Sequence, residues 1–236
     1  MNKTGLVTGG ARGIGAEISR HLLDEGWDLI VHYNNSGDEA RRLADNSGAK
    51  ICGADLSQAE EVEALADKVE STFESLDLLV NNAARFSRAA LQDIDDTDWE
   101  DHMAVNARAP LFLTRRLTPL LRKNSGTIVN IVDWATRSPY PGYLSYMASK
   151  GALETLTRGL ARSLAPEVRV NGIAPGPIEF PEDFPEKQKK KIIGKTLLQR
   201  QGAKKEIARA VLFLAEEATF TTGSILEVDG GRHVNS

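Results

Sequence analysis

Short apolar runs alternate with amphipathic stretches along the whole chain. Seven of these runs have the length and composition of strands: residues 3–8, 28–33, 49–52, 76–80, 127–132, 169–173 and 224–228. Most are continuously apolar at their centres, as expected for parallel strands that are covered on both faces. The pattern therefore predicts an α/β fold of the Rossmann type, a doubly wound seven-stranded parallel sheet with helices on both faces.

The stretches between these runs predict helices. A helix between the third and fourth strands is indicated by one apolar stripe, formed by Val62, Leu65, Ala66, Val69 and Phe73. Capping-box patterns predict helix starts at residues 36–39, 57–60 and 97–100. No repeat, low-complexity tract or linker interrupts the alternation, so residues 1–236 are predicted to form a single domain.

The segment from about 175 to 202 departs from this alternation because it is rich in proline and charge. We expect a substrate flap there, lying over the carboxyl edge of the sheet. The lysine run KQKKK at 187–191 is interpreted as a solvated helix face.

Composition narrows the class of protein. With 41% hydrophobic and 26% charged residues, a packed globule is expected, and the net charge of −4 argues against a nucleic-acid surface. No apolar run approaches the roughly 18 residues of a membrane span, and no signal peptide is recognisable. The lone Cys52 cannot form an internal disulfide. We expect a cytoplasmic protein that acts on a small molecule, with no membrane partner and no metal site.

A glycine-rich turn, TGGARGIG, follows the first predicted strand. Glycines such as Gly9, Gly13 and Gly15 let the backbone approach a pyrophosphate, and the next helix directs its first amides at that group. The spacing differs from the common G-x-G-x-x-G fingerprint, and a tight strand-to-helix connection is the alternative. Its position between an apolar strand and an amphipathic helix favours a dinucleotide site.

The end of the second predicted strand indicates which dinucleotide binds. An NAD site usually places an acidic side chain there, about 20 residues after the glycines. Here the strand ends HYNNS without a carboxylate, and Asp38 and Glu39 fall within a predicted capping box. Arg12 in the glycine turn suits a 2′-phosphate, with Asn35 and Ser36 as hydrogen-bond donors. The sequence therefore predicts NADP(H).

Polar residues also follow the later strands. Asp55 is placed to accept a hydrogen bond from an adenine amino group, and NNAA at 81–84 places small residues where a cofactor passes. Asn106 lies in a helical stretch, where it is either structural or beside the site. Tyr146 and Lys150 are four residues apart and share one helix face, with about 6 Å between them along the axis.

Taken together, TGGARGIG, NNAA, Asn106, YMASK, VRVNGIAPGPI and VDGG resemble the short-chain dehydrogenase/reductase family along nearly the whole chain. The resemblance implies that Tyr146 donates a proton, that Lys150 holds the nicotinamide ribose and lowers the tyrosine pKa, and that Asn106 supports a water. A phenol with a reference pKa of about 10 becomes a usable acid when an ammonium stabilises its anion. Tetramers are common in this family, so a homotetramer is expected. The residues assigned to the cofactor are Gly9, Arg12, Gly13, Ile14, Gly15, Tyr33, Asn34, Asn35, Ser36, Asp55, Leu56, Asn82, Ala83, Ala84, Tyr146, Lys150, Pro175, Gly176 and Ile178.

One residue departs from the family pattern. Asp133, thirteen residues before Tyr146, stands where the family usually has a serine that polarises a substrate carbonyl. The pteridine reductase branch resembles this chain at that point and in an aromatic residue after NNA, here Phe86. In that branch the aromatic ring and the nicotinamide sandwich a flat pterin, although a serine of the branch is Ala84 here. The alternative interpretation is that Asp133 only caps the following helix.

These observations predict an NADPH-dependent reductase in which Tyr146, Lys150, Asp133 and Asn106 are catalytic. Phe86, Asp133 and Tyr146 are expected to bind the substrate. The predicted reaction is the reduction of C=N bonds in a pterin-like or dihydrofolate-like compound. A carbonyl reductase, such as a 3-oxoacyl thioester reductase, is the alternative enzyme. A catalytically silent NADP-binding sensor is the alternative from another class, although it has no need of Tyr146 and Lys150.

Overall fold

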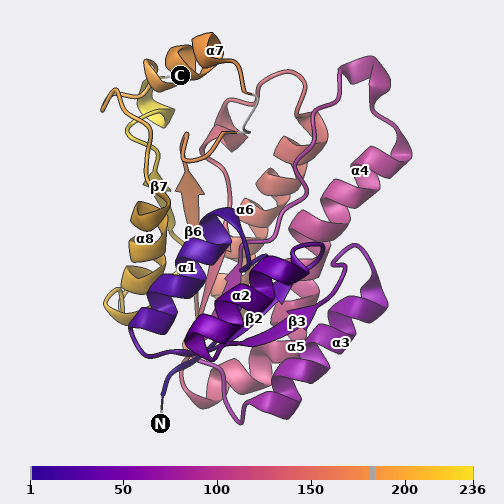
Figure 1. The fold of residues 1–236 in the computed structure, drawn as a ribbon, viewed down its shortest axis with the longest axis vertical. Helices are drawn as coiled ribbons and strands as arrows, with labels where there is room; N and C mark the ends of the chain where they lie inside the picture. The colour runs from indigo at the N-terminus through magenta and orange to yellow at the C-terminus, as the bar shows by residue number, and fades with distance from the viewer. Residues whose placement is uncertain (1, 181–183, 236) are drawn as a thin grey trace.

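The computed structural model describes residues 2–180 and 184–235 and is built around one parallel sheet (Figure 1). The strand order is β3-β2-β1-β4-β5-β6-β7, and every neighbouring pair is parallel. The strands are β1 (Thr4–Val7), β2 (Asp28–Tyr33), β3 (Lys50–Gly53), β4 (Leu78–Asn81), β5 (Thr127–Ile131), β6 (Arg169–Pro175) and β7 (Ile225–Val228). Each overlaps a predicted apolar run, which confirms the predicted seven-stranded parallel sheet.

Helices cover both faces of this sheet (Figure 1). The longer ones are α1 (Gly13–Asp24), α2 (Gly37–Ser47), α3 (Ala59–Thr72), α4 (Asp96–Met103), α5 (Ala109–Lys123), α6 (Leu144–Leu164), α7 (Glu186–Ile193) and α8 (Lys204–Glu216). Four short helical turns also occur: η1 (Leu91–Asp93), η2 (Ala104–Arg108), η3 (Trp134–Arg137) and η4 (His233–Asn235). One core lies between the sheet and α3, α5 and α6, and a second lies between the sheet and α1, α2 and α8. The predicted doubly wound arrangement is therefore confirmed.

The helix starts differ from the predicted capping boxes. Ser36 precedes α2 but makes no side-chain cap, and a backbone bond to its carbonyl closes the first turn instead. The α3 helix begins after Gln58. The side-chain amide of Gln58 donates a hydrogen bond to the Ser57 hydroxyl, the group that the predicted box used as its cap. The α4 helix begins two residues earlier than predicted, with Asp95 as its N-cap in place of Thr97, because the Asp95 carboxylate accepts from the Asp98 amide at 2.8 Å. All three predicted boxes were wrong, since backbone bonds and competing side chains supply the caps.

The register aligns the carboxyl ends of the central strands. Val7 of β1 lies opposite Val80 of β4, and Ile131 of β5 lies opposite Ile173 of β6. Strand order reverses between β1 and β4, which is where ligands of such sheets bind. The predicted flap includes α7, which lies near the carboxyl ends of β6 and β7 (Figure 1), and its residues 181–183 lie outside the described residues. Within the described part of the chain, no helix combines the length and apolar character needed to cross a membrane.

Candidate active site

The turn between β1 and α1 has the backbone geometry of an anion cradle. Gly9 and Gly13 have φ values of 60° and 58°, a region that side chains rarely adopt. A Cβ atom at Gly15 would lie 2.1 Å from the Gly9 carbonyl oxygen. No side chain caps α1 at Arg12, so its first amides remain available to a ligand. The turn therefore fits the pyrophosphate of a dinucleotide.

Two side chains hold this turn in place. The His32 ring accepts from the Gly9 amide through Nδ1 at 3.0 Å and, through Nε2, donates to the Ala54 carbonyl at 2.9 Å. Burial lowers the pKa of His32, which keeps the ring neutral and able to accept. The Asn82 side-chain amide donates to the carbonyls of Thr8 at 2.9 Å and Gly9 at 3.1 Å. Asn82 thus fixes the turn through its side-chain hydrogen bonds. His32 fixes it as well, and the sequence did not predict that role.

A cavity of about 370 Å³ opens at this turn, at the point where strand order reverses. The predicted cofactor residues that line it are Gly9, Arg12, Gly13, Ile14, Gly15, Tyr33, Asn34, Asn35, Ser36, Asp55, Leu56, Asn82, Ala83 and Ala84. Pro175, Gly176 and Ile178 are not among the lining residues. Gly176 instead packs against Asp229, and Ile178 is buried in the α1 and α8 core. Sequence reasoning also missed lining residues, namely Ala11, His32, Arg85, Val105 and Glu179.

Glu179 is the unexpected residue among these. A Cβ atom on Gly13 would lie 2.9 Å from its Oε2 atom, so the carboxylate faces the glycine turn. Lys204 at the start of α8 holds the same carboxylate through an ion pair of 2.7 Å. No periodic pattern predicts this contact, because Glu179 comes from the segment after β6.

The far end of the cavity is formed by the residues that end β2. Tyr33, Asn34, Asn35 and Ser36 line the cavity together with Arg12. Asp38 and Glu39 are absent from the described lining residues. Asp38 pairs with Arg41 on the surface at 2.5 Å, a different role from the predicted capping box. The lining of this end of the cavity therefore includes hydrogen-bond donors and a guanidinium, groups that suit a 2′-phosphate.

Asp133, Tyr146 and Lys150 come together beyond the cavity. The Tyr146 hydroxyl donates to Asp133 Oδ2 at 3.0 Å. The other carboxylate oxygen accepts from the Ala135 amide at 2.8 Å and caps η3. Lys150 Nζ donates to the Ile131 carbonyl at 2.7 Å and lies 5.8 Å from the centre of the Tyr146 ring. Asp133 therefore makes the helix-cap contact considered from the sequence, and it also accepts from the tyrosine, a contact that the sequence did not predict.

Burial dominates the electrostatics of this group. It raises the pKa of Asp133, while the hydrogen bonds from Ala135 and Tyr146 act in the opposite direction. It also raises the pKa of Tyr146 well above the usual value, and the negative charge of Asp133 adds to the shift. Burial lowers the pKa of Lys150 to about 8, with partial compensation by Asp133. Desolvation and the Asp133 carboxylate account for the raised tyrosine pKa. The expected role of Lys150 in lowering that pKa stays a prediction.

Asn106 is fully buried in η2, a π-helical turn. Its Oδ1 atom accepts from the Arg85 amide at 2.7 Å, and its Nδ2 donates to the Arg85 carbonyl at 3.0 Å. Nδ2 also donates to Ser149 Oγ at 2.8 Å. The side chain thereby links the loop after β4 to α6, one residue before Lys150.

Phe86 lies against the tyrosine, as the sequence suggested for a substrate-binding aromatic residue. Its ring is 55% exposed and packs edge-on against Tyr146, with 4.8 Å between ring centroids. Its parallel neighbour is Tyr143, at 4.9 Å and an interplanar angle of 12°. Tyr143 therefore covers one face of the Phe86 ring.

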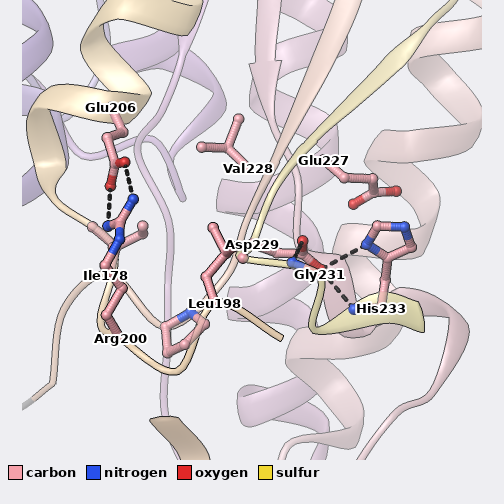
Figure 2. A pocket seen from close by; sticks show the side chains of 12 residues that line it. Ile178, Leu198, Arg200, Glu206, Glu227, Val228, Asp229, Gly231 and His233 are labelled. Carbon is pink, nitrogen blue, oxygen red and sulfur yellow. Dashed lines mark hydrogen bonds and ion pairs between the residues drawn. The ribbon is translucent and has the colours of Figure 1, made fainter. Parts of the chain in front are cut away.

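A second cavity of about 350 Å³ lies between the segment after β6 and the end of β7 (Figure 2). Arg200 and Glu206 form a paired ion bridge at its margin, with contacts of 2.6 and 3.0 Å. Glu227, Asp229 and His233 bring possible metal-ligating atoms within 4.8 Å of one another. Asp229 accepts from the His233 amide at 2.6 Å and from its Nδ1 at 2.8 Å, as Figure 2 shows. These hydrogen bonds shape the turn after β7 and account for the proximity of Asp229 and His233.

The whole chain is similar in sequence and structure to known reductases. A family model described as Enoyl-(Acyl carrier protein) reductase matches residues 9–233. The 3-oxoacyl-(acyl-carrier-protein) reductase FabG of Staphylococcus aureus is 33% identical over 244 aligned residues, covering 99% of each chain. The structure of FolM alternative dihydrofolate reductase 1 from Brucella suis, in complex with NADP, has a TM-score of 0.92 and 34% identity, covering 99% of this chain and 96% of that chain. A blue fluorescent protein from a metagenomic library, in complex with NADPH, has a TM-score of 0.92 and 33% identity, covering 98% of this chain and 97% of that chain.

Proposed function

Because this chain belongs to the short-chain dehydrogenase/reductase family and is an NADP(H)-dependent oxidoreductase, we propose that it reduces C=N bonds in a pterin-like or dihydrofolate-like substrate. The observation that carries this proposal is the hydrogen bond from the Tyr146 hydroxyl to the Asp133 carboxylate. A carboxylate repels the oxyanion that develops during carbonyl reduction, whereas it stabilises a protonated or N–H-bearing ring. The site is therefore better suited to nitrogen than to a carbonyl oxygen.

In the proposed reaction, the bound cofactor supplies a hydride to the carbon of the C=N bond. Tyr146 gives its hydroxyl proton to the nitrogen, so the product carries one new C–H and one new N–H bond. Asp133 accepts the hydrogen bond of Tyr146 and orients the hydroxyl before transfer. Lys150, when protonated, stabilises the tyrosinate that remains, and a proton from solvent restores the phenol.

The rest of the site holds the two reactants in this proposal. The amides of the glycine turn bind the pyrophosphate, Arg12 binds the 2′-phosphate and Lys150 binds the nicotinamide ribose. Asn106 positions the loop after β4 against α6. Phe86 stacks on the flat ring of the substrate, opposite the nicotinamide. We expect residues 1–236 to act as one NADP-binding domain, with the segment at about 175–202 as a substrate flap, in a cytoplasmic homotetramer.

Relatives support two substrate classes. FolM of Brucella suis is described as an alternative dihydrofolate reductase, which favours a reduced-pterin substrate for this chain. FabG of Staphylococcus aureus acts on 3-oxoacyl groups on the acyl carrier protein by its name, and the identity to this chain is similar. Carbonyl reduction is thus the second candidate. Asp133 favours the first, while Ala84 removes one hydroxyl that the pteridine reductase branch offers to its substrate.

The test is turnover with NADPH on matched substrates, using dihydropterin, dihydrofolate, a 3-oxoacyl thioester and a quinone. The wild-type protein should reduce the C=N substrates with the higher kcat/KM. In Asp133→Ser, reduction of C=N bonds should fall about 100-fold, the low end of the range for an impaired proton transfer, because the carboxylate no longer orients Tyr146 or stabilises an N–H-bearing ring. Carbonyl reduction should hold or rise, since the repulsive charge is gone. Asp133→Asn is the matched control, because its amide oxygen can still cap η3 without a negative charge.

Three outcomes would contradict the proposal. Equal losses on all substrates in Asp133→Ser would mean that Asp133 serves only as the cap of η3. A preference of the wild-type protein for the thioester would favour the carbonyl reductase. Absence of turnover on every substrate, with NADPH still bound, would favour the silent sensor.

A further inference from the structure

A partly buried polar cluster lies directly behind Tyr146 and takes no part in the proposed chemistry. It consists of Ser87 from the loop after β4, Asp98 and His102 from α4, and Ser145 from the first turn of α6. His102 is fully buried, and its ring lies 6.4 Å from that of Tyr146, measured between centroids. The cluster thus brings together three segments that are separate in the sequence.

The Asp98 carboxylate is the common acceptor of this cluster. One oxygen accepts from Ser145 Oγ at 2.6 Å, and the other accepts from Ser87 Oγ at 3.2 Å. His102 Nδ1 donates to the Asp98 carbonyl at 2.7 Å, since a carbonyl can only accept. Ser87 Oγ also lies 3.3 Å from His102 Nε2. A carboxylate is needed at position 98 because both serine hydroxyls point to it as donors.

The partners of Asp98 adjoin the two side chains that the proposed function uses. Ser145 directly precedes Tyr146, and Ser87 directly follows Phe86. Asp98 itself is fixed, because the Asp95 carboxylate caps its amide at the start of α4. A single anchored carboxylate therefore connects the backbone that carries the stacking ring with the backbone that carries the proton donor.

We propose that Asp98 is a positioning residue that sets the spacing between Phe86 and Tyr146, now 4.8 Å between ring centroids. The inference rests on the proposed function, because it assumes that Phe86 contacts the substrate and that Tyr146 donates the proton. The Asp98–Ser145 bond holds the proton donor, and the Asp98–Ser87 bond holds the stacking ring. Each of these two hydrogen bonds should therefore affect a different kinetic constant.

The experiment measures kcat and KM in variants that each remove one of the two hydrogen bonds to Asp98. Ser145→Ala should lower kcat about tenfold with little change in KM, because the lost bond is made to a charged acceptor. Ser87→Ala should raise KM about threefold to tenfold with kcat nearly unchanged. Asp98→Ala should show both the lower kcat and the higher KM. Asp98→Asn should show one of these two changes in weaker form than Asp98→Ala, since an amide has one acceptor oxygen. Affinity for NADPH should stay within twofold throughout.

Coupling between the variants separates positioning from a merely structural role. Ser145→Ala in the Asp98→Ala background should change kcat less than twofold, because its partner is already absent. Ser163→Ala on the same helix is the control, since its hydroxyl bonds only to the Gly159 carbonyl on the exposed face, and it should change neither constant. The serine variants keep the test usable if Asp98→Ala fails to fold.

Additive effects in the double variant, or equal changes of kcat and KM in both serine variants, would overturn the positioning role. The measurement uses whichever substrate of the panel the wild-type protein reduces. A turnover preference for ketones would therefore defeat the proposed function, while the coupling between Asp98 and Ser145 could still be confirmed.

Discussion

The proposed cofactor half and the proposed substrate half of this site are built in different ways. The cofactor half is mainly backbone: a glycine turn whose geometry excludes side chains, followed by the free amides of α1. The substrate half is made of side chains from separate segments, with Phe86, Asp133 and Tyr146 meeting only in the folded chain. Backbone cradles recognise a group common to many ligands, whereas convergent side chains select one reaction.

The two halves also differ in how they handle charge. At the glycine turn, His32 is kept neutral by burial so that it can accept from the Gly9 amide. Beyond the cavity, burial places Asp133 and Lys150 in the same apolar surroundings, and their pKa values move toward each other. The cofactor half should therefore respond little to pH near neutrality, and the substrate half should respond strongly.

The largest expected effect comes from removing the proton donor. Tyr146→Phe should lower kcat by about 1,000-fold or more, within the range for loss of a positioned acid, because the phenol acts only in the chemical step. The dissociation constant for NADPH, measured by fluorescence titration, should stay within about twofold. Such a variant would bind the cofactor normally while lacking the chemical step. Retention of a substantial fraction of the wild-type rate would mean that another group is the acid.

A second effect follows from the lowered pKa of Lys150. Because burial brings this pKa from 10.5 to about 8, the ammonium is present below pH 8 and is lost as pH rises through that value. The kcat/KM for reduction should then fall about tenfold per pH unit above 8, since the neutral amine cannot stabilise the tyrosinate. Lys150→Arg is the control, because a guanidinium keeps its charge and should remove the decline. A flat wild-type profile between pH 7 and 10 would contradict this assignment.

The same contrast explains what the sequence could predict. The seven strands follow from continuous apolar runs, and the glycine turn is encoded within eight consecutive residues, so both are local signals. Glu179 lies over Gly13 only because the chain after β6 returns to the first turn. Asp98 joins Ser87 and Ser145 across three elements, and no periodicity marks that contact. The strands and the glycine turn were predictable from local signals, whereas the helix caps and the contacts between distant polar side chains depended on the fold.

A smaller effect should appear within the cofactor half. Arg12 lines the cavity, and Asp38 and Glu39 do not, so NADPH should bind at least tenfold more tightly than NADH, about 1.4 kcal/mol. Arg12→Ala should remove most of that preference by weakening NADPH alone. Lys204→Ala is a useful comparison, because that cation pairs with Glu179 and should not discriminate between the two cofactors. Equal affinities for both cofactors in the wild-type protein would contradict a 2′-phosphate site at Arg12.

The smallest expected effect tests whether the substrate half selects a flat ring. Stacking contributes about 0.5–1.5 kcal/mol beyond area burial, so Phe86→Ala should raise KM for a pterin by roughly twofold to tenfold and leave kcat nearly unchanged. Phe86→Leu is the matched control, because it keeps apolar bulk without a ring face. Tyr143 stacks on Phe86 and could take over part of the contact, so Tyr143→Ala should add to the loss in the Phe86→Ala background. If Phe86→Ala instead lowered kcat and spared KM, the ring would be supporting Tyr146 through their 4.8 Å edge contact rather than binding the substrate.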